Sequence, residues 1–74
     1  MTLREIKTGI KIFGAYRNKK TKNTYIVYDI GKHSETLEYM VIYHAVNDDE
    51  IWIRPLDLFK EKFDLFDEPG IFKV

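Results

Sequence analysis

Three short runs of β-branched and aromatic residues, separated by polar stretches, constrain the fold of this 74-residue chain more than any other feature. The runs cover residues 24–30, 38–46 and 51–54, with polar residues at 31–37 and 47–50 between them. Runs of this length and composition are typical of strands, and the polar stretches are typical of turns. The pattern therefore predicts a mainly β or all-β fold, either a small barrel or a strongly bent antiparallel sheet.

The N-terminal residues predict a short helix ahead of the β core. Thr2 and Glu5 have the spacing of a capping box, and Gly9 is suited to end the helix that this box begins. An extended conformation of the residues after Gly9 is also compatible with the sequence. Residues 14–17 then predict a first strand, which is followed by a polar turn at residues 18–23.

The C-terminal third has two readings. Pro55 suits the first position of a short helical turn over residues 56–60, which a last strand over residues 60–66 would follow. The alternative is one longer helix, because four apolar residues recur there at helical spacing: Leu56, Phe59, Phe63 and Phe66. A turn at residues 67–70 and a short tail at residues 71–74 are predicted to end the chain.

These elements predict a single domain over residues 1–74, with residues 1–13 as an N-terminal helix or extension and residues 14–66 as the β core. A chain of this size buries only about 60% of the surface that it exposes when unfolded, so its stability is marginal. It has no cysteine to form a disulfide or a thiolate metal site, but its 5 Tyr, 5 Phe and 1 Trp can supply packing.

The turn at residues 47–50 predicts how two of the strands pair. If Val46 opposes Ile51, then Tyr43 opposes Arg54, and side chains alternate between the two faces of the sheet. The first face is aliphatic apart from His44 and is predicted to be the core: Met40, Ile42, Val46, Ile51 and Ile53. The second face carries Tyr39, Val41, Tyr43, Trp52 and Arg54. A shift of the register by one residue would exchange the two faces.

The second face is the candidate binding surface. Aromatic rings beside a guanidinium group suit flat ligands, which can stack, and anions, which can pair with the cation. We therefore expect Tyr43, Trp52 and Arg54 to contact a ligand of this kind. The loop before the middle strand is expected to line the same site with His33, Ser34, Glu35, Thr36 and Glu38. The alternative is a second small core, in which Glu35 or Glu38 pairs with Arg54.

No motif in the chain indicates catalysis. The sequence has no nucleophile elbow, phosphate-binding loop or dinucleotide fingerprint. Ser34 and His33 are adjacent, which places them badly to act as nucleophile and base. The two histidines, His33 and His44, lack a recognised metal-ligand spacing, so neither a metal nor another cofactor is expected. The simpler expectation for His33 is that it forms hydrogen bonds with the backbone of its own loop.

Charge is unevenly distributed along the chain, although the net charge is zero. Residues 1–37 hold eight basic and three acidic residues, whereas residues 38–74 hold four basic and nine acidic residues. This polarity could steer an anionic ligand or promote self-association, or it could simply be solvated surface charge. A basic patch interleaved with Tyr16 and Tyr25 suits single-stranded nucleic acid, although lysine-rich turns also protect strands from aggregation. The patch comprises Arg17, Lys19, Lys20, Lys22 and Lys32.

The chain also resembles a small bacterial family known as domain of unknown function 1653. The resemblance covers about residues 14–63 and rests on two paired motifs, His-Ser-Glu-Thr-x-Glu at residues 33–38 and Trp-x-Arg-Pro at residues 52–55. Further matches are Gly14, Tyr16, Arg17, Val41, Ile42, Tyr43, Leu56 and Phe59, and departures are Asn18, Leu58 and both turns. The resemblance implies an SH3-like small β fold in a stand-alone cytoplasmic protein of a bacterium or phage, with no established activity.

These features predict a non-enzymatic binding module for a small anionic or nucleotide-like ligand, or for nucleic acid. The alternative is a protein–protein interaction module or homodimer without a small-molecule ligand, which exposed aromatic residues and the charge-polar halves would favour. No run of residues is apolar enough to span a membrane, and the N-terminus lacks a signal-peptide core. Because the chain also lacks cysteine, a cytoplasmic location is expected.

Overall fold

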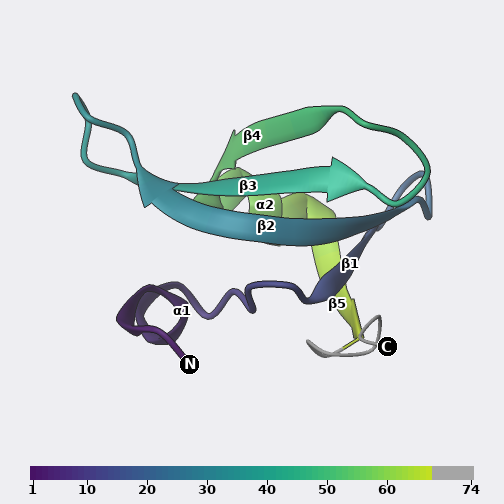
Figure 1. Cartoon of the computed structure of the whole chain (residues 1–74), viewed down its shortest axis with the longest axis horizontal. Helices are drawn as coiled ribbons and strands as arrows, with labels where there is room; N and C mark the ends of the chain where they lie inside the picture. The colour runs from purple at the N-terminus through teal and green to yellow at the C-terminus, as the bar shows by residue number, and fades with distance from the viewer. Residues whose placement is uncertain (68–74) are drawn as a thin grey trace.

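The computed structural model describes residues 1–67, which form a five-stranded antiparallel sheet with two short helices. The strands are β1 (Ala15–Asn18), β2 (Thr24–Lys32), β3 (Tyr39–Ala45), β4 (Ile51–Pro55) and β5 (Phe63–Asp67), and the helices are α1 (Leu3–Thr8) and α2 (Leu56–Lys62). The strand order is β4-β3-β2-β1-β5, so the chain runs across the sheet to β4 and then returns to the opposite edge, beside β1 (Figure 1). The prediction of a mainly β fold is confirmed.

The sheet is open rather than closed. Its outer strands, β4 and β5, pair only with β3 and β1 respectively within the described residues. The prediction of a small SH3-like barrel is therefore wrong, and the open antiparallel sheet is what the chain forms. The register shifts between Val27 and Asp29 in β2 and between Ala15 and Tyr16 in β1, and such irregularities bend and twist strands locally.

Both predicted ends of the first helix are confirmed. The Thr2 hydroxyl accepts a hydrogen bond from the Glu5 N–H at 3.2 Å, and the Glu5 carboxylate accepts one from the Thr2 N–H at 2.6 Å. Gly9 ends the helix with φ 75°, a left-handed conformation that glycine adopts without strain. Glu5 also accepts a hydrogen bond from the Ile12 N–H at 3.0 Å. These backbone N–H donors, Thr2 first, lower the pKa of Glu5 from its usual 4.5 and fix α1 to the loop that leads into β1.

The C-terminal third follows the first of its two predicted readings. Helix α2 ends where Phe63 takes up an extended conformation (φ −128°, ψ 145°), and β5 begins there, so one longer helix is excluded. Pro55 is the last residue of β4 and the N-cap of α2 rather than its first helical residue. Asp67 belongs to β5 rather than to the predicted turn, whereas the rest of that turn and the predicted tail lie outside the described residues.

Strands β3 and β4 pair two residues away from the predicted register. Tyr43 opposes Trp52 rather than Arg54, and Ile51 opposes His44. The cause is Val46, which was expected to oppose Ile51 but donates its N–H to the Thr24 carbonyl at the start of β2, at 3.1 Å. Because the displacement is an even number of residues, every side chain keeps the face that the sequence assigned to it.

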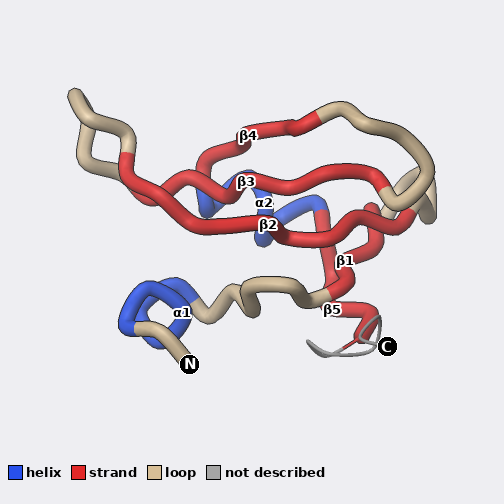
Figure 2. The backbone as a smooth tube through the Cα atoms, viewed as in Figure 1, coloured by secondary structure: helices blue, strands red, loops and turns tan. Residues whose placement is uncertain are grey.

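The assignment of the buried face, in contrast, is wrong. Val41 and Tyr43 on the aromatic face are buried, whereas Ile51 and Ile53 on the aliphatic face are 54% and 61% exposed. The cause is α2, which connects β4 to β5 at the opposite edge of the sheet (Figure 2). Its Phe59 packs with Val41 and Tyr43, so the helix covers the aromatic face. The aromatic face is therefore the core side of the sheet, and the aliphatic face is its open side.

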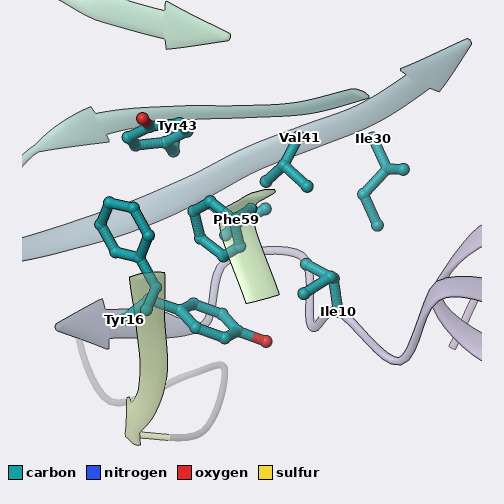
Figure 3. Packing of buried hydrophobic residues seen from close by; sticks show 8 residues of the cluster. Ile10, Tyr16, Ile30, Val41, Tyr43 and Phe59 are labelled. Atoms are coloured by element: carbon teal, nitrogen blue, oxygen red, sulfur yellow. The ribbon is translucent and has the colours of Figure 1, made fainter. Parts of the chain in front are cut away.

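Aromatic rings from α2 and from three strands form the centre of the core. The Phe59 ring stacks on the Phe63 ring at a centroid distance of 4.4 Å, and it meets the rings of Tyr16 and Tyr43 edge-on at 5.2 and 5.1 Å. Figure 3 shows Tyr16, Tyr43 and Phe59 close together, with aliphatic side chains alongside. The buried cluster is Ile10, Tyr16, Val27, Ile30, Val41, Tyr43, Phe59 and Phe63.

Candidate functional site

Tyr43, Trp52 and Arg54 converge on one hollow at the β4 edge of the core side. The hollow has a volume of about 170 Å³ and is lined by Asn18, Tyr25, Tyr43, Trp52, Arg54 and Phe63. We call it the aromatic hollow. Tyr43 and Trp52 are cross-strand partners, but Tyr43 is 3% exposed and Trp52 is 49% exposed, so Tyr43 belongs to the floor and Trp52 to the rim. The Arg54 guanidinium carbon lies 5.7 Å from the centre of the Phe63 ring.

A second hollow adjoins the first and is rich in cations. It has a volume of about 390 Å³ and is lined by Asn18, Lys19, Lys20, Thr21, Arg54, Glu61 and Lys62. We call it the basic hollow. Asn18 and Arg54 line both hollows. Glu61 is the single acidic residue among these seven, against four basic ones, so the hollow favours an anion.

The turn between β1 and β2 places the lysines of the basic hollow. The Asn18 side-chain oxygen accepts hydrogen bonds from the N–H groups of Lys20 and Thr21, at 2.9 and 3.0 Å. The Lys19 N–H donates to the Lys62 carbonyl at 2.9 Å, which ties this turn to the end of α2. The Lys19 ammonium group lies 3.7 Å from Asp64, in an exposed pair that contributes little to stability. Backbone hydrogen bonds therefore hold the three lysines around one opening.

Arg54 is free of a carboxylate partner within residues 1–67. The ion pairs among these residues are those of Arg4 with Asp29 and of Lys19 with Asp64. Neither Glu35 nor Glu38 pairs with Arg54, so the predicted brace is not formed. The Arg54 guanidinium group therefore retains donors that an anion could use.

Burial raises the pKa of the Tyr43 phenol above its usual 10.0, and the neighbouring Arg54 guanidinium partly opposes that rise. A group with a raised pKa in the folded state contributes stability that is complete below its unfolded pKa and is lost as pH rises through the folded pKa. We expect the parent protein to lose stability above pH ~10 and the Tyr43→Phe variant to lose less. Urea unfolding at neutral and alkaline pH measures the difference, and identical alkaline losses in the two proteins would refute this role for Tyr43.

The loop at residues 33–38 lies away from both hollows. It joins β2 to β3 beyond the pair Lys32–Tyr39, at the opposite end of β3 from the turn that leads into β4 (Figure 1). Neither hollow is lined by a residue of this loop, and Tyr43, the cross-strand partner of Trp52, is four residues or about 13 Å further along β3 than Tyr39. The structure therefore does not bring His33, Ser34, Glu35, Thr36 and Glu38 together with Trp52 and Arg54.

This loop is closed by its own hydrogen bonds. The His33 ring nitrogen Nδ1 accepts the N–H groups of Glu35 and Thr36, at 3.1 and 3.3 Å, and the His33 N–H donates to the Glu38 carbonyl at 2.9 Å. The Thr36 hydroxyl donates to the Glu38 carboxylate at 3.2 Å. The expectation that His33 bonds to backbone is confirmed. Within residues 1–67, no cluster of three or more His, Asp or Glu side chains is arranged to hold a metal ion.

Four residues of the predicted basic patch, Arg17, Lys19, Lys20 and Lys22, line two adjoining hollows, and Lys32 lies apart from them. Lys32 lies at the far end of the sheet, 5.3 Å from the centre of the Tyr39 ring, and Tyr16 is buried in the core. The Arg17 guanidinium carbon lies 3.8 Å from the centre of the Phe66 ring. Arg17 and Lys22 line a further hollow next to the basic hollow, whereas Lys19 and Lys20 line the basic hollow itself.

Sequence reasoning missed the part of the site that comes from β1, α2 and β5. Asn18 opposes Phe63 because β5 pairs with β1, and this pairing joins residues 45 positions apart. Lys62 is brought to the basic hollow by the same pairing. The available signal was the aromatic spacing of Phe59 and Phe63, which indicated that the segment after Pro55 has an apolar side to bury.

The fold defines a small, mainly β domain with an open antiparallel sheet. A family model described as "Protein of unknown function (DUF1653)" matches residues 14–68, and the chain belongs to this family. No curated protein and no solved structure matches the chain. None of the helices in residues 1–67 has the length and apolar character needed to cross a membrane. The function must therefore be argued from the two hollows.

Proposed function

We propose that the protein is a non-enzymatic binding module for a nucleotide-like ligand, a flat ring that carries a phosphate. The observation that carries the proposal is that Arg54 lines both the aromatic and the basic hollow. A ring against Trp52 would occupy the first hollow, and a phosphate near Arg54, Lys20 and Lys62 would occupy the second. Aromatic side chains stack on bases of any sequence, and guanidinium groups bind phosphate with two donors.

The size of the hollows favours a mononucleotide or the end of a single strand. A nucleoside monophosphate has about 20 non-hydrogen atoms, and ligands of this size gain about 0.3 kcal/mol for each of them. The product, about 6 kcal/mol, corresponds to a Kd in the tens of micromolar. The three lysines are exposed and Arg54 is half-buried. Salt screens exposed charges most, so we expect the affinity to fall as salt is added.

Titration of the parent protein with adenosine monophosphate, followed by tryptophan fluorescence, tests the proposal. Trp52 is the single tryptophan of the chain, so the signal reports on the rim of the aromatic hollow. We expect saturable binding of the nucleotide, with weaker binding of adenosine and of inorganic phosphate because each of them fills one hollow. The Arg54→Gln variant should bind the nucleotide at least about 10-fold more weakly, since it loses a charge-assisted hydrogen bond.

Lys32→Gln is the matched control, because it removes one positive charge at the other end of the sheet. This variant should bind the nucleotide with the affinity of the parent. Absence of any fluorescence response, or equal weakening by Arg54→Gln and Lys32→Gln, would show that binding at Arg54 does not occur.

A further inference from the structure

Strand β4 is an edge of the sheet whose first three residues carry no protecting charge or proline. It pairs with β3 on one side and with no strand of the described chain on the other, so N–H and C=O groups along its outer side have no ladder partner. Its first three residues, Ile51, Trp52 and Ile53, are exposed and carry no charge, whereas a charge and a proline, Arg54 and Pro55, stand at its end. Charged residues and proline in an edge strand usually prevent it from pairing with other chains. The opposite edge, β5, does carry charges, at Asp64 and Asp67.

On the open side of the sheet next to this edge, aliphatic side chains lie beside three aspartates. Ile53 and Ile51 oppose Ile42 and His44 on β3, and all four side chains lie on the face that α2 does not cover. A shallow hollow of about 690 Å³ lies there, lined by Tyr28, Asp29, Ile42, His44, Val46, Asp48, Asp49 and Ile51. Extension of the sheet beyond β4 would therefore continue the aliphatic face as well as a hydrogen-bonded ladder.

The sequence of β4 is complementary to itself in the antiparallel direction. A two-fold axis perpendicular to the sheet pairs residues that share a face. If the axis passes through Trp52, Ile51 of each copy opposes Ile53 of the other, and Glu50 of each copy opposes Arg54 of the other. Trp52 then opposes its own equivalent, and two isoleucine pairs and two pairs of opposite charge flank it, with no like charges opposed.

We propose that a second copy of this chain pairs with β4 edge to edge, antiparallel and centred on Trp52. The pairing satisfies the outer backbone groups of both β4 strands and joins the two open aliphatic faces into one. An edge of five residues buries less area than the ~1,200 Å² of a standard interface, so we expect dissociation in the micromolar range. The pairing does not require the nucleotide site, but it uses two of the same residues, because Arg54 would face Glu50 of the second copy and Trp52 would face its own equivalent. A nucleotide and a second copy should therefore compete, and the test of the pairing uses no ligand.

Sedimentation equilibrium over a range of concentrations tests the pairing. The parent protein should approach twice its monomer mass of 8.9 kDa. Ile53→Lys, which places a charge opposite Ile51 of the second copy, should raise the dimer Kd at least about 10-fold. Leu65→Lys is the matched control, because Leu65 is 43% exposed in the middle of the other edge strand, and it should leave the Kd unchanged.

A charge exchange tests the register. Glu50→Arg alone should weaken the dimer, because it opposes two cations across each symmetric pair, and the double variant Glu50→Arg/Arg54→Glu should recover the parental Kd. A parent protein that stays monomeric up to millimolar concentration would overturn the proposal. An Ile53→Lys variant that dimerises like the parent, or a double variant that remains as weak as Glu50→Arg, would overturn it too.

Discussion

Replacement of Phe59 by alanine is expected to lower the free energy of unfolding by about 3–5 kcal/mol. Phe59 is fully buried and contacts the rings of Tyr16, Tyr43 and Phe63, so its removal leaves a cavity at the meeting point of α2 and three strands. Small domains have a total stability of only about 5–15 kcal/mol, so the variant should be close to its unfolding transition at room temperature. Urea unfolding followed by circular dichroism measures the loss.

Leu58→Ala is the control for this substitution. Leu58 belongs to the same helix but is exposed, so its truncation should cost less than about 1 kcal/mol. If both variants lost the same free energy of unfolding, Phe59 would not be packed in the core as Figure 3 shows it.

Neighbouring residues on β3 should lose different amounts of stability on the same substitution. Val41→Asn puts an amide into the buried face and should cost about 3 kcal/mol, from the lost burial of valine and the unmet hydrogen bonds of the amide. Ile42→Asn changes the next residue, which is half-buried on the open face, and should cost about 1 kcal/mol. Asparagine is used because an aspartate at position 41 could pair with Arg54, its cross-strand neighbour.

The order of these two losses decides which face of the sheet is the core. Urea unfolding measures the free energy of unfolding of both variants, and the two values can be compared if the free energy falls with urea concentration at the same slope. A greater loss for Ile42→Asn would restore the aliphatic face as the core and would remove the aromatic hollow as a feature of the folded protein.

The strands were predictable because their signals are local. Alternating β-branched and aromatic residues defined β2, β3 and β4 to within two residues, and the Thr2–Glu5 box defined the start of α1. The exact hairpin pairing was not predictable, since it depends on the hydrogen bond from Val46 to Thr24, which joins distant parts of the chain.

The choice of buried face could not be made from the alternation alone. Both faces of β3 and β4 carry apolar side chains. The alternation of side chains along a strand assigns each residue to one of two faces, but it does not show which face another element, such as a helix, will cover. The position of α2 decides it, through Phe59 and Phe63. For the same reason the sequence could group Tyr43, Trp52 and Arg54 on one face but could not add Asn18 and Lys62, which β1 and α2 supply.

The loop at residues 33–38 was assigned to the candidate site because of its composition, and this assignment was misleading. Its dense polar sequence suggested the rim of a site, but the His33 ring and the Thr36 hydroxyl are engaged in hydrogen bonds within the loop. A short segment rich in His, Ser and Thr can meet its own hydrogen-bonding needs in a tight connection. A high content of polar residues therefore does not distinguish a loop that binds a ligand from a loop that only connects two strands.

Nuclear magnetic resonance mapping of the bound nucleotide tests most directly whether Arg54 joins the two hollows into one site. Amide and indole resonances would be followed as adenosine monophosphate is added to the labelled parent protein. We expect little change at residues 33–38 and the largest shifts at Asn18, Lys20, Trp52, Arg54 and Lys62. Shifts concentrated at residues 33–38, or on the open face at Ile42 and His44, would contradict this expectation.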